Sequence, residues 1–148
     1  MIDLSVVIPT KDRLGLLGWC LEGVSRAAER AGREGISAEV VVSVDGPDEG
    51  EGASASARLG GVPTVVLSAR PGDAAGPAAA RNRALDAVRG EIVLFLNDDA
   101  APDEACFAEH ARAHAALGGR AAMVLGDAPW EDRPGKSAFD ALVERVAG

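Results

Sequence analysis

The sequence predicts a single α/β domain whose mostly parallel sheet is covered by helices on both faces. Short apolar runs rich in β-branched residues alternate along the chain with longer segments whose apolar residues recur at helical spacing. Within these runs polar residues do not alternate with apolar ones, which is typical of strands buried on both faces. The 148 residues are enough for one domain, so we assign residues 1–148 to a single unit.

The first half of the chain contains three predicted strands. Residues 4–8 (LSVVI) form the first, which stops at Pro9. The helix that follows has apolar residues at helical spacing and glycines at its end, namely Leu14, Leu17, Leu21, Val24, Gly32 and Gly35. Residues 39–44 (EVVVSV) form the second strand, residues 45–52 a loop rich in Gly, Pro and acids, and residues 64–67 the third strand.

The second half continues the alternation. An Ala- and Arg-rich helix is predicted over residues 78–88 and ends at Gly90, and a strand follows over residues 91–96. Pro102 and the acids after it favour a helix start, and that helix ends at two glycines. A fifth strand is predicted over residues 121–125. A last helical stripe comprises Phe139, Leu142, Val143 and Val146.

Charge and cysteine content exclude several classes of protein. The chain has 15 Lys+Arg and 23 Asp+Glu, a net charge of −8, which would repel a nucleic acid. Cys20 and Cys106 are too few for a disulfide framework, and we expect them to be buried free thiols. With no signal peptide and no apolar run long enough to span a bilayer, we expect a cytoplasmic protein. A peripheral membrane contact remains open.

Polar residues cluster after four of the predicted strands. Ligands of open parallel α/β sheets bind beyond the carboxyl ends of the strands, so these residues mark a candidate site. They are Thr10, Lys11, Asp12 and Arg13 after the first strand, Asp45 after the second, Arg81 and Asn82 in the helix after the third, and Asn97, Asp98 and Asp99 after the fourth.

The acids at residues 98 and 99 are the most informative of these. Adjacent carboxylates repel one another unless a cation compensates them, and Mg²⁺ or Mn²⁺ commonly takes one or two carboxylates together with substrate phosphates. The alternative is that one caps a turn and the other is solvated. Asp45 fits either an acceptor for a base N–H or an ordinary turn residue. Arg13 and Arg81 fit either contacts to an anion, which a helix N-terminus attracts, or surface positions.

Three other motifs do not fit their usual contexts. No G-x-G-x-x-G follows the first strand, so a dinucleotide-binding interpretation is weak. Residues 135–137 (GKS) resemble the end of a P-loop, but Trp130 stands where its first glycine belongs. His110 and His114 lie four residues apart without a third metal ligand, so we interpret them as ordinary helix residues.

Four segments resemble family 2 glycosyltransferases of the GT-A fold, in that family's order. They are residues 5–13 (SVVIPTKDR), 41–46 (VVSVDG), 76–85 (GPAAARNRAL) and 93–100 (VLFLNDDA). The resemblance implies a Rossmann-like, three-layer α/β/α domain that binds a nucleoside-diphosphate sugar and Mg²⁺ or Mn²⁺. It also implies an inverting transfer of the sugar to an acceptor hydroxyl of a glycan, a lipid or a small molecule.

The resemblance also implies roles for individual residues. Pro9, Thr10, Lys11 and Arg13 would line the nucleotide pocket. Asp45 would accept a hydrogen bond from the base. Arg81 would contact the nucleotide or its diphosphate, Asp98 the ribose or the sugar, and Asp99 would ligate the metal ion.

The chain departs from the family pattern at several positions, among them Lys11-Asp12 in place of an aromatic-Asn pair and Val44-Asp45 in place of an Asp-Asp pair. Asn97 replaces the first acid of the D-x-D motif, which affects the choice of nucleotide more than the fold. Family members continue into an acceptor-binding half that supplies the general base, and nothing after Trp130 matches it, so the chain is expected to lack that half.

The alternative function is a non-catalytic nucleotide-sugar-binding or regulatory module, a truncated glycosyltransferase domain. A nucleotidyltransferase is disfavoured because residues 9–13 contain no glycine, and a homodimer covering an exposed sheet edge remains open.

Overall fold

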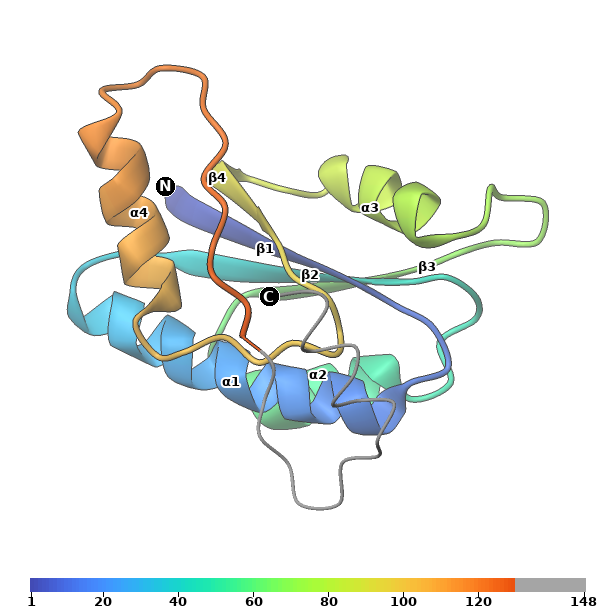
Figure 1. Cartoon of the computed structure of the whole chain (residues 1–148). Coiled ribbons are helices and arrows are strands. Elements are labelled where there is room, and N and C mark those ends of the chain that lie inside the picture. Colours follow the sequence, from blue (N-terminus) through green and yellow to red (C-terminus); the bar gives the residue numbers. More distant parts are fainter. Residues whose placement is uncertain (130–148) are drawn as a thin grey trace, which may run out of the picture.

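The computed structural model describes residues 1–129, which alternate between strands and helices as predicted (Figure 1). The elements in chain order are β1 (Ile2–Thr10), α1 (Leu14–Arg33), β2 (Ala38–Val44), α2 (Glu51–Leu59), β3 (Thr64–Ser68), α3 (Pro77–Leu85), β4 (Gly90–Phe95) and α4 (Cys106–Ala116). The last predicted helical stripe, over Phe139 to Val146, lies outside the described residues.

The four strands form one parallel sheet in the order β3-β2-β1-β4, which confirms the predicted parallel topology. β1 lies inside the sheet, with Val7 opposite Val41 of β2 on one side and Phe95 of β4 on the other. Successive strands add outward from β1 to β3, and the chain then returns to the other side of β1. The strand order therefore reverses between β1 and β4, where a crevice opens in folds of this type.

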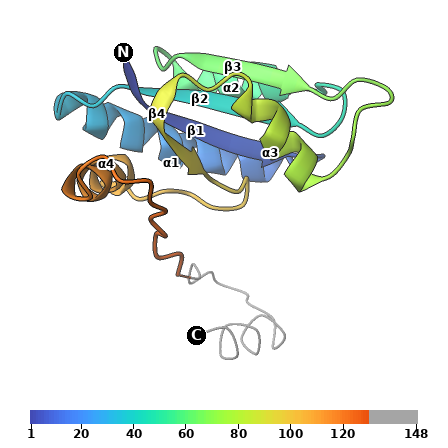
Figure 2. The same ribbon diagram turned by 90° about the horizontal axis from the view of Figure 1, so that it is seen from above.

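The two faces of the sheet carry apolar residues that pack against different helices. Leu4, Val6 and Ile8 of β1 point to the larger core, which also contains buried residues of α1, α2 and α4. Val7 points to the other face, where it packs with Val41 and with Ala84 of α3. Figures 1 and 2 show the resulting three layers, with α1 and α2 on one side of the sheet and α3 on the other.

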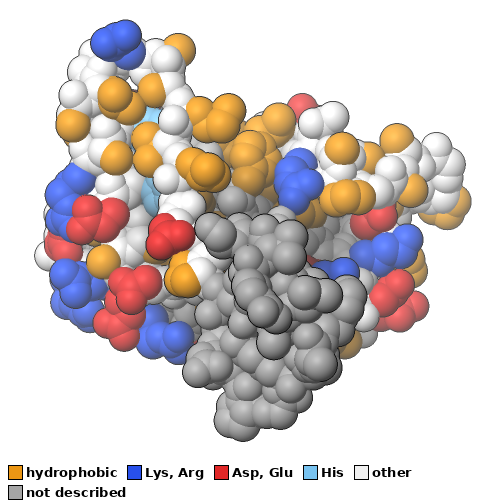
Figure 3. All heavy atoms as spheres, in the orientation of Figure 1, with side chains coloured by type: hydrophobic (Ala, Val, Ile, Leu, Met, Phe, Trp, Pro, Cys, Tyr) orange, Lys and Arg blue, Asp and Glu red, His pale blue; other side chains and the backbone are white. Residues whose placement is uncertain are grey.

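α1 is the main helix of the larger core, and α4 packs beside it, with Phe107 of α4 fully buried in the same core. Leu17, Leu21 and Val24 recur at helical spacing and are fully buried. Gly23 allows the chain before α4 to approach, because a Cβ atom there would lie 3.0 Å from the Pro102 ring. At the far end Arg112 of α4 pairs with Glu34 at 2.8 Å. Figure 3 shows charged side chains gathered where these helices meet and hydrophobic ones along the segment after α4. None of the helices within residues 1–129 has the length and apolarity needed to cross a membrane.

α2 replaces the end of the loop predicted over residues 45–52. Its Ala/Ser/Gly composition gives little helical periodicity, so the pattern of apolar residues did not indicate it. Local hydrogen bonds organise its start, because the Asp48 carboxylate accepts the backbone N–H groups of Gly50 and Gly52 at 3.0 and 3.1 Å. The Glu51 carboxylate likewise accepts the N–H of Glu49 at 2.8 Å.

The predicted fifth strand over residues 121–125 is wrong, because no strand forms there among the described residues. Gly118 and Gly119 have φ values of 62° and 75° and turn the chain after α4. The following segment does not pair with β4, and the Met123 and Leu125 side chains are 92% and 93% exposed. An apolar run becomes a strand only where a neighbouring backbone accepts its hydrogen bonds.

Two helix boundaries also differ from the sequence prediction. The helix predicted over residues 78–88 ends at Leu85, and Gly90, predicted as its stop, is the first residue of β4. Glycine is required at this position because a Cβ atom would lie 2.6 Å from the backbone nitrogen of Ser5. The helix predicted from Pro102 begins only at Cys106, after a turn in which Asp103 accepts the N–H of Ala105.

A buried polar cluster ties three segments together at the amino-terminal half of the sheet. Glu39 of β2 is fully buried and accepts hydrogen bonds at 2.6 Å from the Ser5 hydroxyl and from the Arg89 backbone N–H. The Arg89 guanidinium binds the second carboxylate oxygen. Burial by itself would raise the pKa of Glu39, but these donors outweigh it and hold the pKa below its ordinary value.

We predict that Glu39→Gln lowers the free energy of unfolding by about 2 kcal/mol, because it removes a charge-assisted contact from a buried site. Urea denaturation measures this loss. Glu29→Gln is a matched control, since the ion pair of Glu29 with Arg33 is highly exposed. Equal stabilities of Glu39→Gln and Glu29→Gln would contradict a structural role for the cluster.

The stabilisation by Glu39 is expected to depend on pH. Its pKa is lower in the folded protein than the ordinary value of 4.5, so the folded state favours the charged carboxylate. The contribution is fully present above 4.5 and is lost as the pH falls through the folded-state pKa. The difference in stability between wild type and Glu39→Gln should therefore be constant near neutral pH and shrink below about pH 4.5.

Candidate functional site

The register of the sheet brings the ends of β1 and β4 together at the point where the strand order reverses. Val7 lies opposite Phe95, and the Leu96 N–H continues the ladder by donating to the Val7 carbonyl at 3.0 Å. Thr10 and Asp98 each follow three residues later, so both lie at the carboxyl-terminal edge of the sheet, next to the point of reversal. In Figure 1 this edge of the sheet faces the start of α1.

A buried hydrogen bond joins these two strand ends. The Thr10 hydroxyl donates to Oδ2 of Asp98 at 2.8 Å, and the two residues are only 4% and 5% exposed. The preceding residue, Pro9, is also buried and pairs in register with Ser43 of β2. The contact holds the Asp98 carboxylate in one orientation, with its other oxygen directed to Arg13.

The loop after β1 brings a guanidinium group to the acid pair. Asp12 adopts a φ of 53°, a left-handed conformation that Asp tolerates better than most residues, and α1 begins directly after Arg13. Arg13 lies 3.3 Å from Oδ1 of Asp98 and 3.4 Å from Oδ2 of Asp99. Half of the Asp99 side chain remains exposed, so this carboxylate is the more accessible of the two.

Arg81 reaches the same edge from α3. Its guanidinium donates to the side-chain oxygen of Asn97 at 2.8 Å, although the two residues come from different crossovers. Asn97 thus acts as a neutral acceptor for the arginine where an acid is more common in the D-x-D pattern. The sequence did not assign this role to Asn97, and nothing in its spacing indicates the pairing with Arg81.

Asp45 has one satisfied carboxylate oxygen and one that is not. Oδ2 accepts the backbone N–H of Gly76 at 2.9 Å and lies 3.7 Å from Nζ of Lys11. Oδ1 is buried and has no hydrogen-bond partner within residues 1–129. A buried carboxylate oxygen without a donor is unfavourable by a few kcal/mol, so this atom is suited to receive an N–H or O–H from a ligand.

The site combines three cations with three carboxylates. Lys11, Arg13 and Arg81 supply the positive groups, and Asp45, Asp98 and Asp99 the negative ones. The helices α1 and α3 both begin at this edge, so the positive ends of their dipoles face it. Such an edge offers donors to an anion and acceptors to a cation within the same site.

Cys20 lies beneath the acid pair and is not a nucleophile there. Its thiol is buried and approaches the Asn97 carbonyl at 3.6 Å. Burial first, and then the charges of Asp98 and Asp99, raise the pKa of Cys20 to about 12. The thiol is therefore neutral near pH 7 and serves as a small apolar residue, as predicted. Cys106 is likewise a free thiol but only half-buried.

All the residues predicted for the site lie at this one edge of the sheet, whereas their roles remain predictions. Sequence reasoning missed the partners that orient them, namely Gly76 for Asp45, Asn97 for Arg81, and Arg83, which binds the backbone beside Asp45. These are contacts of backbone groups or of long side chains between different crossovers. Residue spacing does not encode contacts of that kind.

The acid pair also has the donor chemistry that a hard divalent ion requires. No group of three potential ligand side chains (His, Cys, Asp or Glu) is found within residues 1–129. Asp98 already uses both oxygens in the protein, and Asp99 offers the exposed carboxylate. Mg²⁺ characteristically takes one or two carboxylates and completes its shell with water and substrate phosphates. The residues therefore fit an ion held mainly by a substrate.

Comparison with known protein families identifies the relatives of this chain. The family model described as "Glycosyl transferase family 2" matches residues 5–133. The chain belongs to this family. The match covers the sheet from residue 5 of β1 onward and every residue of the candidate site, which confirms the resemblance noted in the four sequence segments. A search of curated proteins found no significant match.

Solved structures with the same fold include glycosyltransferases of greater length. The crystal structure of S. aureus TarS 1-349 superposes with a TM-score of 0.66 at 21% identity and covers 78% of this chain and 33% of that one. A complex of the same protein with UDP-GlcNAc gives the same score and identity, with 78% and 32% coverage. Mannosyl-3-phosphoglycerate synthase from Rubrobacter xylanophilus gives 0.51 at 23% identity, with 68% and 31% coverage.

These similarities confirm the Rossmann-like GT-A fold predicted from the sequence. The chain spans about a third of the length of the structures that it matches.

We predict that Thr10→Val lowers the free energy of unfolding by about 2 kcal/mol, because it leaves a buried oxygen of Asp98 without its donor. Valine has nearly the same shape as threonine, so packing changes little. Thr64→Val is the matched control, since the Thr64 hydroxyl bonds only to the half-buried Val62 carbonyl. Urea denaturation of both variants measures the difference, and equal losses would contradict a special role for the Thr10–Asp98 contact.

Proposed function

We propose that this chain forms the nucleotide-sugar-binding part of a metal-dependent glycosyltransferase, which moves a sugar from a nucleoside diphosphate to an acceptor hydroxyl. The observation that carries the proposal is the buried, unpartnered oxygen of Asp45, found among residues 1–129 at the edge that also presents Arg13, Arg81 and Asp99. A ligand that supplies one N–H donor and a diphosphate satisfies both parts of this arrangement.

The base of the nucleotide fits the Asp45 position. Uracil, thymine and guanine each carry a ring N–H that can donate to a carboxylate oxygen. The Gly76 N–H fixes Asp45 through its other oxygen, which leaves Oδ1 to receive that donor. Because the solved structures of TarS include a complex with UDP-GlcNAc and another with UDP, UDP is the natural first probe.

The diphosphate then lies toward the acid pair and the arginines. Arg81 and Arg13 hold hydrogen-bond donors that can turn from Asn97 and the acids to phosphate oxygens. Asp99, with its exposed carboxylate, would hold Mg²⁺ or Mn²⁺, while Asp98 contacts the ribose or the sugar. Such an ion, when bound, neutralises the charge that develops on the leaving diphosphate.

The chemistry follows from this placement. As the bond between the anomeric carbon and the diphosphate oxygen breaks, Arg13 and Arg81 stabilise the growing negative charge. An acceptor hydroxyl attacks from the opposite face and inverts the configuration, losing its proton to a general base. We assign that base to no described residue. The acceptor is a glycan, a lipid or a small molecule.

Calorimetric titration with UDP and Mn²⁺ tests the proposal. Wild-type protein should bind UDP more tightly when Mn²⁺ is present, and Asp99→Ala should lose about tenfold in affinity, or about 1.4 kcal/mol. Glu29→Ala is the control, because it removes a highly exposed acid of α1 that pairs with Arg33 on the same helix. Equal UDP affinity in wild type and Asp99→Ala would remove the metal role from Asp99.

The alternative is a module that binds a nucleotide sugar without consuming it. Release of UDP from UDP-sugars, measured with and without mixed acceptors, separates the two functions. Release that depends on Asp99 supports the transferase. Tight binding without any release supports the binding module.

A further inference from the structure

Arg83 of α3 spans the gap between β2 and the loop that precedes α3. Its guanidinium donates to the Ser43 hydroxyl and to the Val44 carbonyl, both at 3.3 Å, and to the Ala74 carbonyl at 3.4 Å. Two of these acceptors belong to the end of β2 and one to the loop. A single side chain therefore ties residues on both sides of the Asp45 carboxylate.

Both segments held by Arg83 are connected to Asp45, one through the chain and the other through a hydrogen bond. Val44 is the residue before it, and Ala74 lies two residues before Gly76, whose N–H binds Oδ2 of Asp45 at 2.9 Å. Gly76 has a φ of 99°, a conformation that favours glycine and that depends on the path of the loop. The orientation of the Asp45 carboxylate thus depends on where the loop is fixed.

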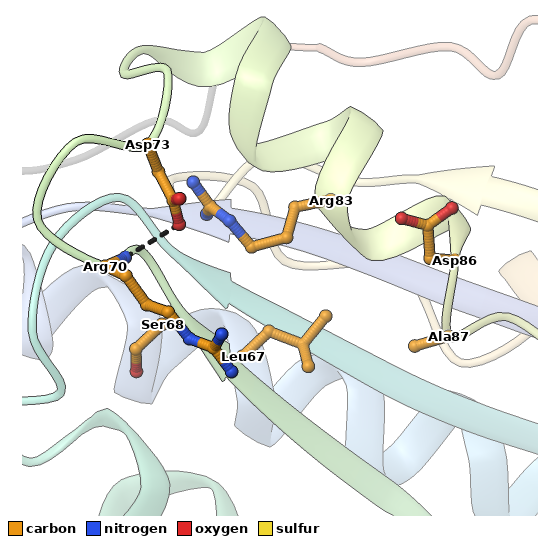
Figure 4. A pocket seen from close by; sticks show the side chains of 7 residues that line it. All are labelled: Leu67, Ser68, Arg70, Asp73, Arg83, Asp86 and Ala87. Atoms are coloured by element: carbon orange, nitrogen blue, oxygen red, sulfur yellow. Dashed lines mark hydrogen bonds between the residues drawn. The ribbon is translucent and has the colours of Figure 1, made fainter.

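Arg83 and a second arginine, Arg70, line an open pocket of about 380 Å³ between β3 and α3. Figure 4 shows the side chains around this pocket. Asp73 accepts the backbone N–H of Arg70 at 2.8 Å, which turns the loop over the pocket. Within residues 1–129 the Arg70 guanidinium makes no hydrogen bond or ion pair. Both arginines line the same pocket and both are positively charged, but only the Arg83 guanidinium contacts the backbone around Asp45.

We propose that Arg83 is a positioning residue that sets the base preference of the site, by holding the 69–76 loop so that Asp45 presents its free oxygen to the nucleobase. The inference rests on the proposed function. It assigns a role in nucleotide selectivity to a residue outside the candidate site itself. Arg83 does not touch the nucleotide. Its loss lets the Gly76 contact open, so Asp45 turns freely and the base loses a fixed acceptor while the diphosphate keeps its partners.

The first test needs no ligand. Hydrogen exchange at the Gly76 amide, followed by NMR, reports directly on its bond to Asp45. Arg83→Gln should increase this exchange rate about tenfold, and Arg83→Lys should restore part of the protection because lysine keeps one charged donor. Arg70→Gln, with the same charge change in the same pocket, should leave the rate unchanged. Unchanged exchange at Gly76 in Arg83→Gln overturns the inference.

The second test measures base preference. Calorimetry with UDP, GDP, CDP and ADP, each with Mn²⁺, gives the preference of each protein, and pyrophosphate gives the contribution that does not involve a base. Arg83→Gln should bind the preferred nucleotide about tenfold more weakly, or about 1.4 kcal/mol. Its affinities for pyrophosphate and for the other nucleotides should stay within about twofold of wild type. Arg70→Gln should retain the wild-type preference.

Three results would count against the inference. Arg83→Gln with the wild-type base preference overturns it and leaves the proposed function intact. An equal loss of affinity for nucleotide and pyrophosphate also overturns it, because Arg83 would then support the whole site. A wild-type protein that binds pyrophosphate but no nucleotide preferentially overturns both the base-reading role of Asp45 and the inference.

Discussion

The hydrogen bond between Thr10 and Asp98 is the contact on which the candidate site depends. It joins the two strands between which the strand order reverses, and it does so with both partners buried. Without it the Asp98 carboxylate would need another donor, and the turn that carries Asp99 would lose its anchor. Arg13 adds an ion pair with Asp98, and Arg81 adds a hydrogen bond with Asn97, next to this bond.

The same central strand carries a second polar cluster near its other end. Ser5 of β1 binds the buried Glu39 carboxylate, and Arg89 closes the cluster from the turn before β4. In the Glu39 cluster the protein satisfies both carboxylate oxygens, which suits a structural role. The candidate site includes an Asp45 oxygen without a partner in residues 1–129, which suits binding. A buried carboxylate thus serves stability or function according to how completely its neighbours satisfy it.

The sequence predicted the parallel sheet and which residues form the site, but not the contacts that orient those residues. Strands were predictable because apolar β-branched runs such as residues 4–8 suit burial on both faces. The site residues were predictable from the strand positions, since parallel strands place their carboxyl ends at one edge of the sheet. α2 was missed because its start depends on local hydrogen bonds from Asp48, and residues 121–125 were wrongly predicted because strand formation depends on a neighbouring backbone. The role of Arg83 depends on long side-chain reach, which residue patterns do not reveal.

The mixture of charges at the site has a consequence for how an anionic ligand arrives. The three cations and three carboxylates cancel at long range, and the whole chain carries a net charge of −8. The diphosphate of the proposed nucleotide ligand would therefore meet a repulsive field from this chain until it is close to Arg13 and Arg81. Dissolved salt screens that repulsion over about 8 Å at physiological ionic strength, so moderate salt speeds the encounter. Proteins that steer their ligands by attraction show the opposite dependence.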